Sequence, residues 1–210
     1  GRTELMNCLF GVDKRAGGEI RLNGKDISPR SPLDAVKKGM AYITESRRDN
    51  GFFPNFSIAQ NIAISRSLKD GGYKGAMGLF HEVDEQRTAE AQRELLALKC
   101  HSVNQNITEL SGGNQQKVLI SKWLCCHPEV IIFDEPTRGI DVGAKAEIYK
   151  VMRQLADDGK VILMVSSELP EIITVCDRIA VFCEGRLTQI LTNRDDMSEE
   201  EIMAWALPHE

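Results

Sequence analysis

Membrane, secreted and nucleic-acid-binding proteins have features that this sequence of 210 residues lacks. Its longest apolar runs, Val130 to Phe133 and Val161 to Val165, are far shorter than the roughly 20 residues of a membrane-spanning helix. The chain does not open with a basic segment followed by an apolar one, so we expect no secretory leader. Because 26 Lys and Arg stand against 31 Asp and Glu, with no basic run, nucleic acid is not an expected partner.

The cysteines lack the spacing of a disulfide-stapled or zinc-binding protein. They stand at positions 8, 100, 125, 126, 176 and 183, and no two of them form a Cys-x-x-Cys pair. A chain of this length can bury a sufficient core without disulfides, so we expect reduced thiols. The run Cys125-Cys126-His127 has no second ligand pair at zinc spacing, and we interpret it as the end of a helix.

The first third of the chain alternates short helices with extended segments. Apolar residues at helical spacing predict a helix over Glu4 to Phe10, and Asn23-Gly24 predicts the tight turn of a β-hairpin. Pro32 to Lys38 is predicted to be a short helix, and Met40 to Thr44 a buried strand. Glu45 then lies at the carboxyl end of that strand.

The rest of the chain is first helical and then alternating. After an irregular stretch at Ser46 to Gly51, helices are predicted at about Ile58 to Ser67, Val83 to Leu98 and Asn114 to Leu124, with a loop at Asp70-Gly71-Gly72. Next come strand Val130 to Phe133, helix Gly143 to Ala156, strand Val161 to Val165, helix Pro170 to Val175, a hairpin within Arg178 to Leu191, and a helix near Ser198. Alternating strands and helices predict an α/β fold with a mainly parallel sheet, into which the helical middle is inserted.

One candidate site lies where the strand Val130 to Phe133 ends in two acids. Open α/β sheets bind ligands outside the carboxyl ends of their strands, which is where Asp134 and Glu135 stand. Asp134 suits Mg²⁺ coordination, and Glu135 can orient or deprotonate the attacking water in phosphoryl transfer. Two acids in a solvated turn would be the simpler interpretation if this motif stood alone.

The second candidate site is the segment Leu110 to Gln116, which we call the signature segment. Ser111 and two glycines come directly before a predicted helix, so backbone N–H groups and the helix N-terminus can face an anion. Ser111 can also donate a hydrogen bond to a phosphate oxygen. An ordinary capped helix has the same Ser-Gly-Gly, but together with the acidic strand end downstream this segment indicates a nucleoside triphosphate.

These segments resemble the motifs of ATP-binding cassette (ABC) ATPases. The signature segment is similar to their signature motif, Ile131 to Glu135 to their Walker B segment, and Gly139-Ile140-Asp141 to their D-loop. The resemblance covers essentially the whole chain. Within the family, the chain more specifically resembles the second cassette of bacterial monosaccharide import ATPases. This resemblance implies a P-loop NTPase core, with 1–45 as its first part, 46–125 as the helical signature lobe and 126–210 as the rest of the core.

The resemblance implies ATP and Mg²⁺ as cofactors, and a role for each matching residue. The nucleotide-binding positions of this cassette would be Gly1, Arg2, Thr3, Glu45 and Ser167, with Thr3 and Asp134 on the metal and Glu135 as the catalytic base. Because two cassettes of the family pack head to tail, a partner's ATP would be served in trans by Ser111, Gly112, Gly113, Asn114 and Gln115, beside the D-loop residue Asp141. The chain is expected to start at the end of the P-loop and to bind ATP poorly alone.

Three positions depart from the family pattern. Arg2 replaces a Lys, which keeps the charge but changes reach and geometry. Glu45 replaces a Gln and Ser167 a His, so an amide donor and a titratable imidazole are both missing. These changes weaken the case for hydrolysis at the cassette's own site, although Asp134 and Glu135 are intact.

Two functions therefore stay open. The first is an ATPase subunit that powers monosaccharide import, and the second is a non-hydrolysing regulatory cassette that supplies the signature segment to a competent partner. An ABC ATPase of DNA repair or translation is disfavoured by the net charge and by the lack of a basic arm.

The resemblance also implies partners and a location. The partners are a second cassette, expected to be the N-terminal half of the same protein, a membrane permease and, indirectly, a periplasmic sugar-binding protein. The location is the cytoplasmic face of the bacterial inner membrane. A permease helix would dock near Phe52, Phe53 and Phe56, although packing between lobes explains these aromatic residues equally well.

Overall fold

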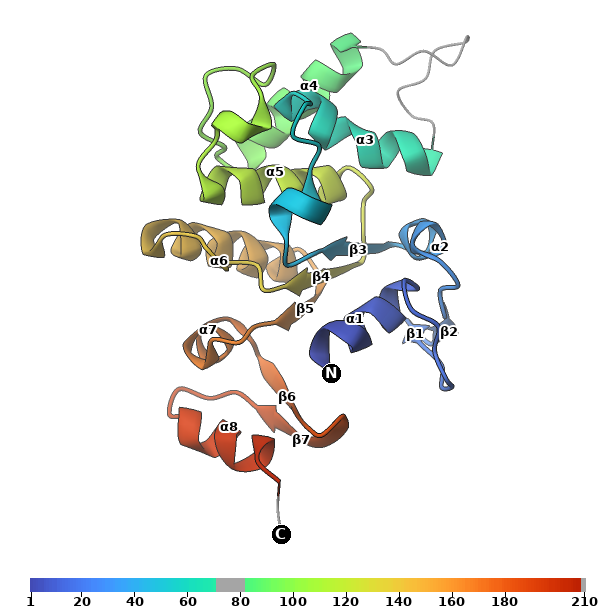
Figure 1. Cartoon of the computed structure of the whole chain (residues 1–210), viewed down its shortest axis with the longest axis vertical. Helices are drawn as coiled ribbons and strands as arrows, with labels where there is room; N and C mark the ends of the chain where they lie inside the picture. The colour runs from blue at the N-terminus through green and yellow to red at the C-terminus, as the bar shows by residue number, and fades with distance from the viewer. Residues whose placement is uncertain (71–81, 209–210) are drawn as a thin grey trace.

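A parallel sheet occupies the middle of the molecule (Figure 1). Within the residues that the computed structural model describes, 1–70 and 82–208, the sheet has the strand order β3 (Met40–Ile43), β4 (Val130–Asp134) and β5 (Val161–Val165). All residues of the central strand β4 are buried. The register sets Ile43 beside Phe133 and Asp134 beside Val165, so the carboxyl ends of the strands meet at one edge. The predicted strands and their parallel arrangement are confirmed.

Helices cover both faces of this sheet. They are α1 (Arg2–Phe10) and α2 (Pro32–Lys37) on one face and α6 (Val142–Asp157) on the other. Successive side chains of a strand point to opposite faces. In β4, Ile132 accordingly packs in one cluster with Phe10, whereas Phe133 packs in another with Ile148. The apolar run of β4 is therefore buried from both sides.

A short hairpin follows α1, as predicted. Its strands are β1 (Arg21–Leu22) and β2 (Lys25–Asp26), which pair antiparallel. Asn23 and Gly24 both have positive φ, 50° and 77°, as a type I′ turn requires.

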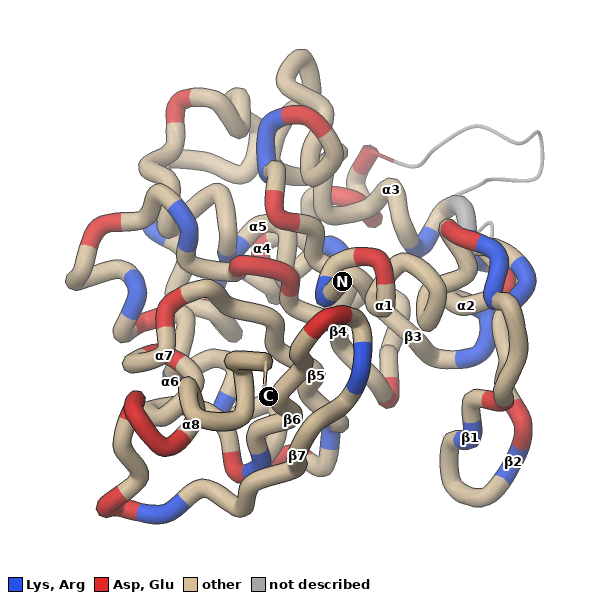
Figure 2. The backbone as a smooth tube through the Cα atoms, turned by 60° about the horizontal axis from the view of Figure 1, so that its bottom comes forward, with Lys and Arg blue, Asp and Glu red and all other residues tan. Residues whose placement is uncertain are grey.

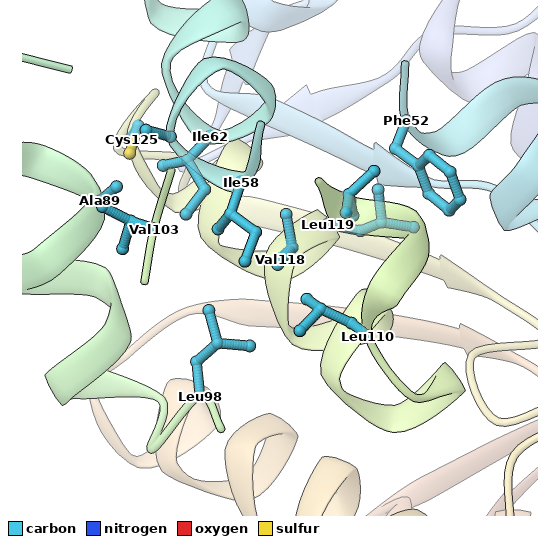
Figure 3. Packing of buried hydrophobic residues seen from close by; sticks show 12 residues of the cluster. Phe52, Ile58, Ile62, Ala89, Leu98, Val103, Leu110, Val118, Leu119 and Cys125 are labelled. Carbon is cyan, nitrogen blue, oxygen red and sulfur yellow. The ribbon is translucent and has the colours of Figure 1, made fainter. Parts of the chain in front are cut away.

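A helical lobe lies at one end of the molecule (Figure 1). Its main helices in the described part of the chain are α3 (Ile58–Asp70), α4 (Glu82–Leu95) and α5 (Gly112–Leu124). Figure 3 shows their shared core, in which Ile58 and Ile62 of α3 lie with Ala89 of α4 and Leu119 of α5. The next residue of α5, Ile120, packs with the sheet instead. Helix α5 therefore joins the lobe to the sheet.

A second, smaller packing unit lies at the other end (Figure 1). It contains α7 (Leu169–Val175), the antiparallel pair β6 (Arg178–Cys183) and β7 (Arg186–Thr192), and α8 (Glu199–Ala206). Ile179 and Val181 of β6 pack with Ile202 of α8 in a cluster of their own. The predicted hairpin and terminal helix are confirmed.

The start of α5 corrects the sequence prediction. The helix begins at Gly112 rather than Asn114, because Ser111 takes the extended N-cap conformation and both glycines enter the first turn. The first N–H groups of a helix have no intrahelical partner, so glycine costs less there than in the interior. The glycines of the signature segment are therefore part of the helix.

Three other predictions made from the sequence differ from the structure or concern residues that the structure does not describe. Helix α4 ends at Leu95 instead of Leu98, because Ala97 adopts a left-handed φ of 47°. The stretch predicted to be irregular contains a π-helical turn, Arg47–Gly51. The loop predicted at Asp70-Gly71-Gly72 is wrong at its first residue, because α3 continues beyond the predicted end at Ser67 to Asp70. Gly71 and Gly72 lie outside the described residues.

Among the described residues, no helix has both the length and the apolar character needed to span a membrane. Along the chain in Figure 2, Lys and Arg are interspersed with Asp and Glu.

Candidate functional site

Asp134 ends strand β4 and is almost fully buried, with 1% of its surface exposed. The hydroxyl of Tyr42 donates to its Oδ2 at 2.9 Å, and the hydroxyl of Thr3 donates to its Oδ1 at 3.4 Å. Burial and the hydrogen bond to this carboxylate raise the pKa of Tyr42, so the tyrosine stays a donor. The structure thus brings together Thr3 and Asp134, the two residues predicted to hold a metal. Their hydroxyl and carboxylate oxygens are hard ligands that suit Mg²⁺.

Glu135 occupies a strained position directly after the strand. Its φ is 49°, a left-handed conformation that non-glycine residues rarely adopt outside turns and functional sites. Its N–H donates to the carbonyl of Val165 at 2.8 Å, which ties the turn to β5. The hydroxyl of Ser167 donates to Oε2 of Glu135 at 3.1 Å. Two residues predicted for the nucleotide site therefore contact each other, with the serine in place of the family's histidine.

The other predicted positions at this edge make contacts within the protein. The guanidinium of Arg2 donates to the carbonyl of Ser166 at 2.6 Å. Glu45, after β3, forms an ion pair with Arg138, in the turn that follows Glu135. An amide at position 45 could not form that ion pair, so the departure from Gln links this edge of the sheet electrostatically to the turn that precedes the D-loop.

A buried carboxylate, Glu171 of α7, organises the groups behind this edge. It is 5% exposed, and its hydrogen-bond donors are Thr137, Lys145 at 2.9 Å, Tyr149 at 2.7 Å and Ser166 at 2.8 Å. These donors come from the turn after β4, from α6 and from the end of β5. One side chain therefore joins all the segments that surround Glu135 and Ser167.

The pKa of Glu171 is the net result of opposing effects. Burial raises it, but the hydrogen bonds from Thr137, Lys145, Tyr149 and Ser166 together outweigh burial and bring the pKa below its ordinary value. Glu171 is therefore ionised at neutral pH. The hydrogen bonds from Lys145 to Glu168 and, to a smaller extent, to Glu171 outweigh burial and raise the pKa of Lys145, so Lys145 and Glu171 both keep their charges.

The signature segment lies on a different part of the molecule, at the N-terminus of α5. Ser111 is exposed, and its side chain makes no cap hydrogen bond to the helix backbone; instead it accepts from Nδ2 of Asn114 at 3.0 Å. The Ser111 hydroxyl therefore lies at the surface, at the N-terminus of α5. Gln115 differs from the other predicted residues, because its side chain is 5% exposed and donates into the lobe, to the carbonyl of Ile107 at 3.3 Å.

The signature segment packs closely against the D-loop and α6. Asp141 caps α6 by accepting from the N–H of Ala144 at 2.9 Å. A Cβ added at Gly113 would lie 2.6 Å from Cβ of that Ala144, closer than atoms can approach. The glycine is thus required by contact with α6, whether or not an anion approaches.

We predict that Gly113→Ala destabilises the protein by about 1–3 kcal/mol, because the added methyl group overpacks this contact. Ala144→Gly in the same chain removes the opposing methyl group and is expected to restore most of the loss. Thermal or urea denaturation of the two single variants and the double variant measures the effect. Gly17→Ala is the matched control, because nothing lies within 4 Å of a Cβ at Gly17. Losses that simply add in the double variant would contradict the proposed contact.

Sequence reasoning missed two residues that the structure places at these segments. Arg47 contacts both the signature segment and the D-loop, and Glu171 joins the segments behind Glu135. Arg47 belongs to none of the motifs. Glu171 ends the segment Val165 to Glu171, which also resembles the family, but no local pattern predicts that either side chain is buried. A buried acid is detectable only when its donors, which are distant in sequence, are seen around it.

The sequence model of the ABC transporter family matches residues 1–138. The chain belongs to the ABC transporter family. It is 98% identical over all of its 210 residues to the D-allose import ATP-binding protein of Escherichia coli. It is 45% identical over 208 residues, 98% of the chain, to a ribose import ATP-binding protein of Bacillus cereus. The chain covers 41% of the length of each of these two relatives.

Solved structures show the same fold. A nucleotide-free ATP-binding cassette from an ABC transporter matches with a TM-score of 0.80 at 20% identity, over 97% of this chain and 80% of that one. A dimeric cassette in a post-hydrolysis state bound to ADP and Pi matches with a TM-score of 0.74 at 21% identity, over 92% and 81%. The ABC transporter chain therefore has the α/β P-loop NTPase fold of these cassettes, as predicted.

Proposed function

We propose that this chain is the second nucleotide-binding cassette of an ATP-driven monosaccharide importer. It couples ATP binding and hydrolysis to transport through a membrane permease. The observation that carries the proposal is the grouping of Thr3, Asp134 and Glu135 at the carboxyl edge of the sheet, in a chain 98% identical to an import ATP-binding protein. D-allose is the sugar we propose, because that relative's name specifies it.

The cassette's own site has the parts for holding a nucleotide with its metal. Thr3 and Asp134 would hold Mg²⁺, which offsets the negative charge of the phosphates. Gly1 and Arg2 would face the phosphates, and Glu45 and Ser167 would border the outermost one. Glu135 would take a proton from the attacking water, held in place by Ser167 and by the backbone of β5.

The signature segment serves a second ATP, held by the partner cassette. Ser111, Gly112, Gly113 and Asn114 would supply a hydroxyl and the N–H groups of a helix N-terminus, which favour a phosphate. Gln115 supports this surface from inside the lobe rather than touching the nucleotide. Asp141 keeps the adjoining D-loop in place by capping α6.

We propose three partners for this cassette: a second cassette, a membrane permease and a periplasmic sugar-binding protein. The partner cassette that we propose is the N-terminal half of the same protein; this chain covers 41% of the length of its D-allose relative. A permease binds the lobe, 46–125, on the cytoplasmic face of the inner membrane, and a periplasmic protein delivers the sugar. Residues 1–45 and 126–210 form the ATPase core. Phe52 is buried in the lobe core, whereas Phe53 is 46% exposed and stacks on Phe56, so this aromatic pair is the proposed permease contact.

We expect Glu135→Gln to lower ATP hydrolysis by about 10²-fold in the full-length importer, because it removes the general base. The measurement uses a background in which the corresponding carboxylate of the first cassette is also replaced, so that only this site is observed. Glu129→Gln is the matched control, since Glu129 precedes the opposite end of the same strand. If no hydrolysis remains in that background before Glu135 is changed, the non-hydrolysing regulatory cassette is favoured instead. Hydrolysis that persists unchanged in Glu135→Gln would contradict the role of Glu135 as general base.

A further inference from the structure

Arg47 lies in the π-helical turn that follows β3 and leads into the lobe. Its side chain is half-buried and reaches two segments that are far apart in the sequence. Nη1 donates to the carbonyl of Gly112 at 3.1 Å, and Nη2 donates to the carbonyl of Gly139 at 3.3 Å. One guanidinium therefore bridges the first turn of the signature helix and the first residue of the D-loop.

Gly112 and Gly139 both lie close to the Arg47 side chain. A Cβ at Gly112 would lie 3.3 Å from each of the two terminal nitrogens of Arg47. Gly139 has a φ of 67°, and a Cβ there would lie 3.7 Å from Nη2 of Arg47. Because Gly112 has no Cβ, its backbone can approach the guanidinium closely.

Hydrogen bonds at both ends fix the conformation of the turn that carries Arg47. Ser46 caps it by accepting from the N–H of Asp49, and the N–H of Phe52 closes it on the carbonyl of Arg47 at 3.2 Å. At its end, the buried ammonium of Lys122 donates to the carbonyl of Gly51. Burial, and to a smaller extent the adjacent Arg48, lowers the pKa of Arg47, but a guanidinium remains protonated at neutral pH.

We infer that Arg47 is a positioning residue that holds the signature segment against the D-loop and so sets the surface presented to the partner cassette's ATP. This inference rests on the proposed function and adds to it a role for Arg47, which lies outside the motifs. The neighbouring ion pair between Glu45 and Arg138 supports it, because it joins the same strand exit to the same turn. A signature segment and a D-loop that move separately would place their donors less accurately.

The required chemistry is specific to arginine. Its planar fork can donate in two directions at once, to carbonyls of two separate segments. A lysine at this position would keep the positive charge but concentrate it on one ammonium nitrogen. Arg47→Lys therefore separates the bridge from the charge, and Arg47→Ala removes both.

The first measurement is hydrogen–deuterium exchange of the full-length protein. In Arg47→Ala, peptides that cover 112–118 and 138–145 are expected to exchange about ten-fold faster, because hydrogen bonds from a charged donor are lost. Arg47→Lys should resemble Arg47→Ala more than the unaltered protein. Arg48→Ala is the matched control: it removes the same side chain from the next, exposed residue and should leave exchange unchanged. Unchanged exchange in Arg47→Ala would overturn the inference.

The second measurement is the rate of ATP hydrolysis by the same full-length variants. Arg47→Ala is expected to lower kcat about 10- to 100-fold with a smaller change in KM, because misplaced groups lose transition-state contacts first. Faster exchange with an unaltered kcat would overturn the role in positioning. If the unaltered protein hydrolyses no ATP, the proposed function fails, while the exchange comparison still tests the bridge. Thermal denaturation identifies a variant that has unfolded, and Arg47→Lys then replaces Arg47→Ala in both tests.

Discussion

Ser111→Arg is expected to lower ATP hydrolysis by the full-length importer about 10²- to 10³-fold, the usual effect of losing a preorganised donor to a phosphoryl or acyl oxyanion. Ser111 presents its hydroxyl at the exposed N-terminus of α5. An arginine there places a long side chain where the phosphates of the partner's ATP are proposed to lie. The steady-state rate with saturating Mg·ATP, measured beside sugar uptake into vesicles, gives the effect.

This loss should occur without unfolding. The Ser111 side chain makes no cap hydrogen bond to the helix backbone, and the hydrogen bond that it accepts comes from the exposed side of the same turn, from Asn114. The melting temperature of Ser111→Arg should therefore stay close to that of the unaltered protein. Glu109→Arg, two residues earlier and also exposed, is the control for an added positive charge. Equal rates for the two variants would mean that the signature segment does not serve ATP.

Glu171→Ala is expected to destabilise the protein by about 3–5 kcal/mol, because removing one partner of a buried charged network leaves the others without it. Thr137, Tyr149 and Ser166 would lose their acceptor, and Lys145 one of its two carboxylates. Urea denaturation followed by circular dichroism measures the difference. Because the same donors hold the segments around Glu135, ATP hydrolysis should fall as well.

Glu168 provides the matched control for this prediction. It pairs with the same Lys145, at 2.7 Å, but is 52% exposed where Glu171 is 5% exposed. Water and salt screen such a pair, so Glu168→Ala should cost at most about 1 kcal/mol. Similar losses in the two variants would show that burial of Glu171 does not set its contribution.

The lowered pKa of Glu171 also predicts a pH dependence. A carboxyl whose folded pKa lies below its unfolded value stabilises the fold above the unfolded value, and this contribution disappears as the pH falls through the folded pKa. Glu171→Gln keeps the shape but cannot ionise. The stability advantage of the unaltered protein over Glu171→Gln should therefore be largest near neutral pH and shrink on acidification below about pH 4.

Local patterns predicted most of the secondary structure. The strand Val130 to Phe133 is apolar and favours extended backbone, and Asn23-Gly24 tolerates the positive φ of its turn, so neighbouring residues were sufficient evidence. Boundaries were less predictable. Helix α5 includes Gly112 and Gly113 because Ser111 is extended as the N-cap residue, and the second glycine packs against Ala144 of a different helix. That contact is invisible in a local pattern.

The candidate site shows the same division. Sequence order placed Asp134 and Glu135 at a strand end, and motif likeness implied their roles. It did not reveal that Glu45 pairs with Arg138, or that Gln115 turns into the lobe. Only the structure shows what the three departures from the family pattern contact: Arg2 the carbonyl of Ser166, Glu45 the side chain of Arg138, and Ser167 that of Glu135.

By itself, the sequence determined the family, the order of helices and strands, and the two segments that indicate ATP, because each depends on residues close together in the chain. The tertiary structure alone decided that Arg47 bridges residues 65 and 92 positions away, and that Glu171 gathers donors from three segments. Such contacts depend on how the lobe, the sheet and α6 pack together. Their free energy comes from burial and from charge paired over long sequence separations, which no local pattern contains.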